Sequence, residues 1–227
     1  MNHTNEPALH NIADSQSVPT KQKIILEAMK LFSVHGFSAV STRTIAAQVG
    51  VSNGALYKHF KSKQDIFDAI ILQSKQIFIN KYKDLMDSCK KQSDLKQMCM
   101  NMFLFQIEDE WIVMFRRMLI VEQFRDQQIA DIYREFNIEM PLQYQAKVFQ
   151  ALISLGIMKE KNPHVLSIEL YAPFFLYHTM PVNRDELIPL LEKHVEYFIE
   201  NYMNNVDIKN NTYLEFNNII KGDKKYE

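Results

Sequence analysis

Apolar residues recur at three- and four-residue steps along most of the chain, which is the spacing of one buried face of an α-helix. The first such segment begins at Thr20 and ends at Gly36, where a glycine can take positive φ and close a helix. No stretch alternates persistently between apolar and polar residues, as a half-buried strand would. The pattern therefore predicts an all-α fold. The apolar face of the first segment comprises Ile24, Ile25, Ala28, Leu31 and Phe32.

Two short helical segments follow, and a tight turn at residues 50–52 separates them. Ser41 and Ser52 stand where these segments begin, and their hydroxyls can accept a backbone N–H as N-caps. Apolar residues occupy the position before each cap and the fourth position after it, which is the hydrophobic-staple arrangement. Leu56 and Phe60 lie four residues apart and face the first helix. Together the three segments predict a helix-turn-helix, whose last helix can enter the major groove of DNA.

Longer helical patterns cover most of the remaining chain. Pro141 should divide one of them, because proline removes a helix hydrogen bond, and Pro173 should kink another. Pro189 should bend the last helix or delay its start. Residues 1–18 show no periodicity and are expected to be disordered, and the Asn- and Lys-rich residues 207–227 receive no assignment. The predicted helical segments are 63–91, 93–108, 110–124, 127–155, 162–180 and 183–204.

Positive charge is concentrated in residues 19–63. Seven lysine and arginine residues face a single acid there, Glu27, which gives this segment a net charge of +6. The whole chain carries −1, so the remainder carries −7. Such a division predicts a basic head that meets a polyanion and an acidic body that does not. Charge alone is equally compatible with a solvated, lysine-rich surface.

The sequence carries no motif of a common enzyme or metal class. It has no P-loop, GxGxxG, HExxH or GxSxG sequence, and no histidine has a second one at i+3 or i+4. Cys89 and Cys99 lack the spacing of a zinc site, and they are expected to be reduced thiols. No apolar run approaches the roughly 18 residues of a membrane helix, and the N-terminus does not read as a signal peptide. We therefore expect a cytoplasmic, non-enzymatic protein without a cofactor, a metal or a membrane partner.

The segment TKQKIILEAMKLFSVHGFSAVSTRTIAAQVGVSNGALYKHFKSKQDIF, residues 20–67, resembles the N-terminal domain of the tetracycline-repressor (TetR) family of transcriptional regulators. The similarity includes LF…HGF and ST…IA…VGVS.GALY.HF.SK. The remainder of the chain resembles the family only in its layout, a helical body that ends in two long helices. The predicted domains are a disordered arm at 1–18, a helix-turn-helix DNA-binding domain at 19–64, a helical effector-binding and dimerisation domain at 65–206 and a polar tail at 207–227.

This resemblance implies a dimeric DNA-binding regulator, most simply a repressor that a small, largely apolar effector releases from a palindromic operator in double-stranded DNA. Two alternatives stay open at this point. One is a DNA-binding architectural or interaction protein without effector control, which would have a filled body. The other is an activator.

The resemblance and the geometry of helix termini together assign DNA contacts. The first turn of the second helix, with Thr42 and Arg43, favours a phosphate, and Arg43 can also reach a guanine edge. Asn53 suits an adenine edge, while Gly54 permits a close approach and Ala55 can touch a thymine methyl. Family positions imply phosphate contacts for the lysines, the tyrosine and the histidine. The full set is Thr42, Arg43, Ser52, Asn53, Gly54, Ala55, Tyr57, Lys58, His59 and Lys63.

Methionine and aromatic residues are dense between residues 102 and 124, and they suit either an ordinary helix core or an apolar effector pocket. Glu122 and Glu169, if buried, would suit a cationic group on the effector. The predicted pocket set is Phe103, Trp111, Met114, Phe115, Met118, Glu122, Tyr144, Phe149, Glu169, Tyr171 and Phe175.

The last two predicted helices each carry an apolar face. The family resemblance implies that these faces pair with a second copy of the chain, whereas the alternative is that they close the core of a single chain. The predicted dimer set is Leu166, Leu170, Phe174, Tyr177, Leu187, Leu191, Val195, Phe198 and Tyr202.

Overall fold

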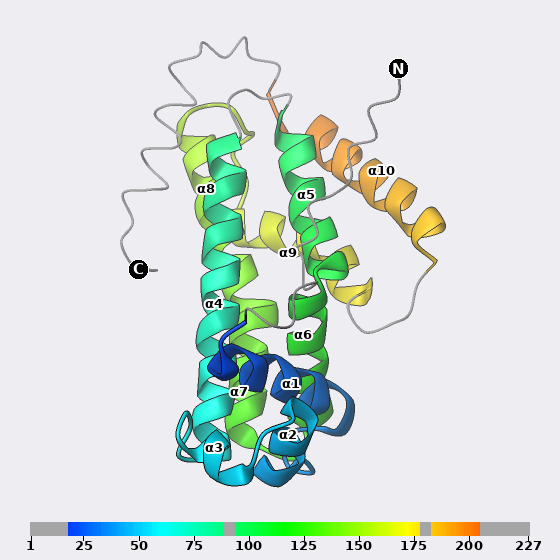
Figure 1. Ribbon diagram of the computed structural model, residues 1–227. Coiled ribbons are helices and arrows are strands. Elements are labelled where there is room, and N and C mark those ends of the chain that lie inside the picture. Colours follow the sequence, from blue (N-terminus) through cyan, green and yellow to red (C-terminus); the bar gives the residue numbers. More distant parts are fainter. Residues whose placement is uncertain (1–17, 89–93, 178–182, 205–227) are drawn as a thin grey trace, which may run out of the picture.

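The computed structural model describes residues 18–88, 94–177 and 183–204, and these residues are almost entirely helical (Figure 1). The sole strand-like pairing among them is one antiparallel bridge between Met158 and Met203. The all-α prediction is confirmed. The helices are α1 (Thr20–His35), α2 (Thr42–Val49), α3 (Asn53–Tyr57), α4 (Lys63–Ser88), α5 (Asp94–Glu108), α6 (Glu110–Glu122), α7 (Gln127–Arg134), the π-helix η1 (Glu135–Glu139), α8 (Met140–Ser154), α9 (Pro163–Tyr177) and α10 (Arg184–Tyr202).

The short helices α2 and α3 begin and end as the local sequence predicts. The Ser41 hydroxyl accepts the Thr44 N–H at 3.1 Å, and the Ser52 hydroxyl accepts the Ala55 N–H at 3.1 Å. Gly50 ends α2 at φ 78°, a left-handed conformation that costs glycine little. These caps satisfy backbone groups that such short helices would otherwise leave unpaired.

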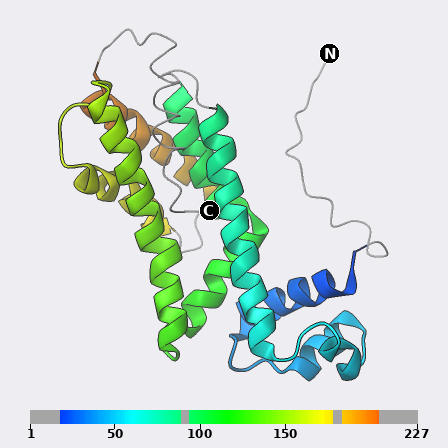
Figure 2. The ribbon, with the colours of Figure 1, turned by 90° about the vertical axis from the view of Figure 1, so that its left-hand side faces the viewer.

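Helices α1–α3 gather at one end of the molecule, where α4 begins (Figure 2). α1 packs against α6 of the body as well as against α2 and α4. Because α4 runs on from this end into the body, one apolar cluster joins the two regions without a break. We call it the lower cluster, and its buried members include Ile24, Ala28, Phe32, Ile45, Leu56, Ile66, Phe67, Phe115 and Met118.

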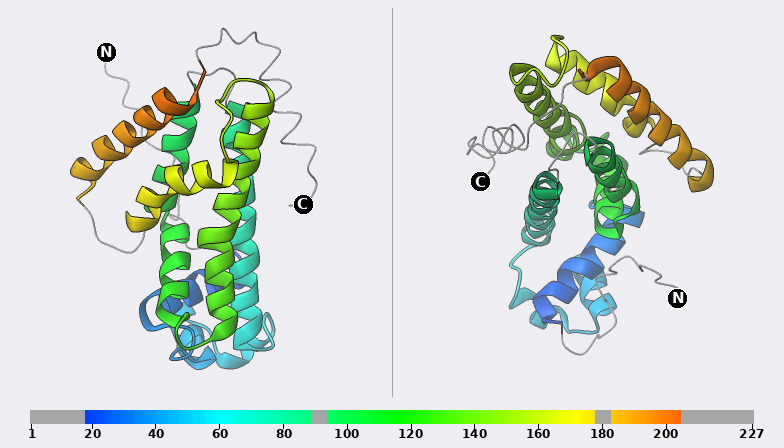
Figure 3. Two further views of the ribbon diagram at one scale, coloured as in Figure 1. Left: turned by 180° about the vertical axis from the view of Figure 1, so that it is seen from behind. Right: turned by 90° about the horizontal axis from the view of Figure 1, so that it is seen from above.

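The opposite end of the body has a second apolar cluster, formed by α5, α8, α9 and α10. α10 lies along the side of the body away from α4 (Figure 3). None of the described helices is both long and apolar enough to span a membrane. We call this second group the upper cluster, and its buried members include Leu95, Phe103, Phe149, Leu166, Leu170, Phe174, Leu191 and Val195.

Pro141 does not divide its helical segment, which corrects the prediction. α7, η1 and α8 follow one another directly, and the π-helical turn lies just before the proline. Proline cannot donate to the carbonyl four residues earlier, which is that of Asn137. The Tyr171 hydroxyl donates to this carbonyl at 3.0 Å. A side chain from α9 therefore replaces the missing backbone donor, and the helix continues.

α10 begins at Arg184, so Pro189 does not delay its start. Asn183 caps the helix by accepting the Asp185 N–H at 3.1 Å. The predicted cap at Ser93 and the predicted ends of two helices beyond Ser88 and Tyr177 lie outside the described residues, as do the predicted arm at 1–17 and tail at 207–227.

Candidate functional site

α3 presents a polar side to solvent while its apolar side is buried. Asn53 and Lys58 are exposed, Tyr57 is 45% exposed, and Leu56 is fully buried in the lower cluster. α2 packs beside α3, so the predicted contact residues of the two helices lie on one surface, which we call the α2–α3 surface. Its exposed members are Arg43, Ser52, Asn53, Gly54, Tyr57, Lys58 and His59, and its half-buried members are Thr42 and Ala55.

Thr42 and Tyr57 are brought together although they lie on different helices. The Thr42 hydroxyl and the Tyr57 hydroxyl form a hydrogen bond of 3.2 Å between α2 and α3. This bond fixes the crossing of the two helices on their outer side, where the sequence predicts phosphate contacts. Both hydroxyls remain at the surface of the molecule, so the pair can both brace the motif and meet a ligand.

Lys63 begins α4, and its ammonium group faces the loop between α1 and α2. Its Nζ donates to the carbonyls of Phe37 and Val40 at 2.7 and 2.9 Å, and to that of Ser38 at 3.4 Å. The same ammonium lies 4.3 Å from the centre of the Phe37 ring. Burial lowers the pKa of the Lys63 amine, and the nearby Glu122 carboxylate opposes this shift. Lys63 therefore holds the loop 36–40 between α1 and α2, and its three protons are directed at that loop.

Lys63→Met tests this positioning role. We expect the free energy of unfolding to fall by about 1–3 kcal/mol because the loop carbonyls lose their donor. DNA affinity should fall, while the slope of log K against log salt concentration stays unchanged. A slope that falls by about one per protomer would show instead that Lys63 contacts a phosphate. The matched control is Lys61→Met, since the Lys61 side chain is exposed.

Glu122 joins the body to the same loop 36–40. It is the last residue of α6, its side chain is 0% exposed, and its two carboxylate oxygens accept the Ser38 N–H at 3.1 Å and the Ser38 hydroxyl at 2.9 Å. Gly36 lies against this carboxylate so closely that a Cβ there would overlap Glu122 Oε1. The sequence predicts Glu122 in an effector pocket, but the structure uses it to connect α6 to the helix-turn-helix.

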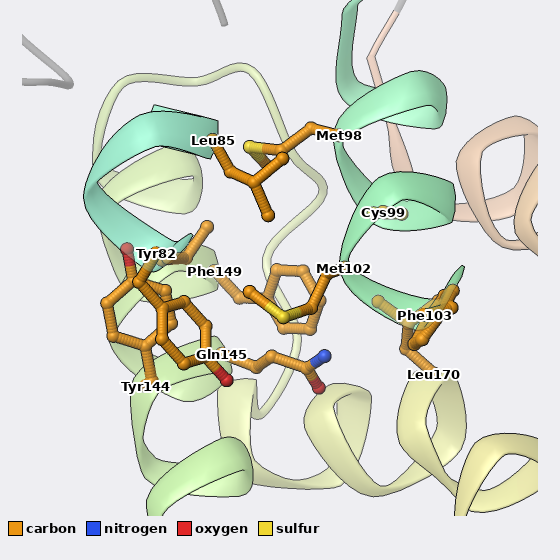
Figure 4. Close-up of a pocket in the computed structure, with 11 residues that line it drawn as sticks. Tyr82, Leu85, Met98, Cys99, Met102, Phe103, Tyr144, Gln145, Phe149 and Leu170 are labelled. Carbon is orange, nitrogen blue, oxygen red and sulfur yellow. The ribbon is translucent and has the colours of Figure 1, made fainter. Parts of the chain in front are cut away.

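A cavity of about 60 Å³ lies inside the body between α4, α5, α8 and α9 (Figure 4). Among the described residues, no lysine, arginine, aspartate, glutamate or histidine contributes to its wall. The polar groups that reach it are two phenols and one amide. The lining residues are Tyr82, Leu85, Met98, Cys99, Met102, Phe103, Tyr144, Gln145, Val148, Phe149 and Leu170.

Residues 24–70 match the sequence model described as bacterial regulatory proteins of the tetR family. The helix-turn-helix domain of the chain is thus of the TetR type. A helix-turn-helix-type transcriptional regulator of Staphylococcus aureus strain USA300 is 32% identical over 91 residues, which are 40% of this chain and 49% of that protein. The chain thus aligns with about half the length of the curated relatives it matches.

Solved structures extend the likeness to the whole fold of the chain. One is SmeT, the repressor of the Stenotrophomonas maltophilia multidrug efflux pump SmeDEF, with a TM-score of 0.59, 19% identity and coverage of 86% of this chain and 96% of SmeT. SmeT is also known in complex with triclosan. Another is GusR of Salmonella enterica, with a TM-score of 0.60, 18% identity and coverage of 82% and 97% of the two chains. At these identities the likeness concerns the fold.

The cavity of the body coincides only partly with the predicted pocket. Phe103, Tyr144 and Phe149 line it. Helical periodicity indicates which residues face inward, but it does not indicate which of them border a void. The lining residues absent from the predicted pocket are Tyr82, Leu85, Met98, Cys99, Met102, Gln145, Val148 and Leu170, the last of which belongs to the predicted dimer set. The predicted residues that lie outside the lining are Trp111, Met114, Phe115, Met118, Glu122, Glu169, Tyr171 and Phe175.

Several of these other residues have partners that explain their position. The Trp111 Nε1–H donates to the Ser74 hydroxyl at 2.9 Å, which fixes α6 against α4. Glu169 is exposed and accepts the Tyr202 hydroxyl at 2.8 Å. It therefore does not meet a buried cation, and the predicted role of Glu169 is corrected.

The predicted dimer faces of α9 and α10 are mostly buried within one chain, which corrects that residue assignment. They fill the upper cluster, and Leu170 also lines the cavity. The buried residues are Leu166, Leu170, Phe174, Leu187, Leu191, Val195 and Phe198, while Tyr177 and Tyr202 are half-buried.

The two helices instead expose a different set of apolar side chains. On α9 successive members lie three, seven and one residues apart, which places them within one side of the helix, and on α10 the two members lie seven residues apart. The set, which we call the outer α9–α10 face, comprises Val165, Ile168, Phe175, Leu176, Leu190 and Tyr197.

Proposed function

We propose that this protein is a dimeric transcriptional regulator of the TetR family that represses genes by occupying a palindromic operator. A small, largely apolar effector that enters the body would release it. The observation that carries the proposal is the α2–α3 surface: a capped helix keeps Leu56 inward and leaves Asn53, Tyr57 and Lys58 facing solvent. A helix held in this way can enter a major groove with its polar side toward the base edges.

The chemistry of this surface separates two kinds of DNA contact. Arg43, Lys58 and the Thr42–Tyr57 hydroxyl pair suit phosphate oxygens, which position a protein on the duplex. Asn53 is the exposed side chain with the donor and acceptor pair that matches an adenine edge. Sequence preference would therefore depend on Asn53 more than on Tyr57.

The cavity favours effector control over a purely architectural role. A body without effector control would be filled, whereas this one has a void lined by methionine, aromatic and aliphatic side chains. Effector sites of this kind are mainly apolar with few polar groups. Glu122 and Lys63 offer a route from the body to the loop 36–40, because one belongs to α6 and the other begins α4.

The outer α9–α10 face supports dimerisation. Large apolar side chains left exposed on two helices that contact each other are candidates for a protein interface. A two-fold dimer would present two copies of α3, and a palindromic operator requires these about 34–36 Å apart or slightly more.

Selection of bound duplexes from a random pool tests the proposal. The selected sequences should contain an inverted repeat, and affinity should fall steeply with salt. A protein that shows no salt-sensitive affinity for any duplex would not be a DNA-binding regulator.

Asn53→Ala and Tyr57→Ala should then differ in kind. Asn53→Ala should reduce discrimination between the selected operator and a single-mismatch operator by about 1–3 kcal/mol, because one base edge is no longer read. Tyr57→Ala should weaken both duplexes by the same factor. Both Kd values are measured for each variant by fluorescence anisotropy, and an equal loss on the two duplexes for Asn53→Ala would contradict its base-reading role.

A further inference from the structure

We propose that the side-chain oxygen of Gln145 determines the specificity of the cavity, and that it selects uncharged ring compounds that carry a hydrogen-bond donor. This inference rests on the proposed function, in which the cavity receives the effector. It adds the chemical class of the ligand and the residue that recognises it.

The side-chain oxygen of Gln145 is buried and accepts no hydrogen bond from any described residue. It is the sole buried side-chain nitrogen or oxygen in the described part of the chain that lacks a partner. Folded proteins rarely leave such an acceptor unpaired. The amide reaches from α8 toward Met102 of α5, inside the ring of lining residues (Figure 4). A ligand with an O–H or N–H group in the cavity would supply the missing donor.

The rest of the wall excludes ions. Burial raises the pKa of the Tyr82 and Tyr144 phenols, so both stay neutral near pH 7. Arg116 is buried in the body, but it does not line the cavity, and its Nη1 donates to the Gln106 carbonyl at 2.8 Å. An anionic or cationic ligand would therefore lose its hydration without gaining a counter-ion.

The cavity also limits the size of the ligand. An apolar cavity of about 150 Å³ takes up benzene, and this one is about 60 Å³. Met98 and Met102 line it from α5, and methionine has three rotatable bonds with which to make room. Phe149 and Tyr144 offer aromatic faces to a flat ligand. A single ring with one hydroxyl is the smallest flat compound that also donates a hydrogen bond to the Gln145 side-chain oxygen.

The test uses three ring compounds of matched shape: p-cresol, p-xylene and p-toluate. Titration calorimetry on the full chain gives the ratio of the p-xylene Kd to the p-cresol Kd. Without an acceptor, p-xylene should bind more tightly because the cresol hydroxyl must leave water. We expect wild type to bind p-cresol at least as tightly as p-xylene, Gln145→Leu to lower the ratio about tenfold, and p-toluate not to bind.

Gln150→Leu is the matched control, since Gln150 is exposed on the same helix, and its ratio should equal that of wild type. Where Gln145→Leu does not fold, Gln145→Met replaces it. The inference would be overturned if the Kd ratio were the same in Gln145→Leu as in wild type, or if wild type preferred p-xylene about tenfold. Binding of p-toluate, or binding of none of the three compounds, would overturn it as well. If a bound water already donates a hydrogen bond to the Gln145 amide oxygen, wild type should prefer p-xylene, which is one of the contradicting outcomes.

DNA affinity is measured on the same preparations. Wild type that binds its operator but does not discriminate between p-cresol and p-xylene ends this inference alone. Wild type that binds no duplex ends the proposed function, whatever the ligand titrations give.

Discussion

Replacing Gly36 by alanine is expected to lower the free energy of unfolding by about 3–5 kcal/mol. Gly36 has φ 84° and ψ 157°, a region that residues with a Cβ rarely enter. The new methyl would also overlap Glu122 Oε1. The carboxylate cannot move aside without losing its two hydrogen bonds to Ser38. Chemical denaturation of the two proteins measures the difference.

Gly50→Ala is the control for backbone strain alone. Gly50 also has positive φ, at 78°, but nothing lies within 4 Å of a Cβ built there. Gly50→Ala should lower the free energy of unfolding by about 1–2 kcal/mol. In a Glu122→Ala background, Gly36→Ala should lower the free energy of unfolding by less, because the overlap with the carboxylate is gone. The remaining loss should approach that of the backbone strain alone. Equal costs of Gly36→Ala with and without Glu122 would contradict the contact between the α1–α2 loop and α6.

Leu190→Lys is expected to convert the proposed dimer to a monomer and to reduce affinity for the proposed palindromic operator at least about 100-fold. Leu190 is 61% exposed on α10 and belongs to the outer α9–α10 face. A lysine there would place two ammonium groups in the dimer interface, where they have no partner. Affinity for an isolated half-site should stay the same, because the α2–α3 surface is untouched.

Sedimentation and anisotropy measure the two effects. The control is Leu72→Lys, since Leu72 is 70% exposed on α4, outside that face, and this variant should remain dimeric. A Leu190→Lys protein that still sediments as a dimer would show that the chains pair elsewhere.

Local features of the helix-turn-helix could be predicted from the sequence because they depend on contacts within a few residues. Ser41 and Ser52 cap their helices by accepting backbone N–H groups three residues on, and Gly50 ends α2 through its own backbone freedom. Leu56 is buried where its spacing predicts. Pro141 marks the limit of such local reasoning, since the donor that replaces its missing N–H is Tyr171, which lies 34 residues from the Asn137 carbonyl that accepts the bond.

The candidate site likewise contains residues whose position the local sequence predicts and residues whose position it does not. The exposed residues of the α2–α3 surface follow from the periodicity of one short motif. Lys63 and Glu122 do not, because their partners are in the α1–α2 loop, and Glu122 lies 84 residues from Ser38. Nothing in the local sequence tells such a lysine from one that meets phosphate, or such a glutamate from one that meets a ligand.

The sequence by itself thus determined the helices, the caps of the short ones and the outward residues of the DNA-binding motif, because each depends on spacing along a single helix. The tertiary structure decided which inward residues border the cavity, and it left the side-chain oxygen of Gln145 without a hydrogen bond from any described residue. It also decided which side of α9 and α10 stays free. Both outcomes depend on how several helices pack together, which the spacing along one helix does not specify. The same apolar side of a helix can be buried within its own chain or against a second copy.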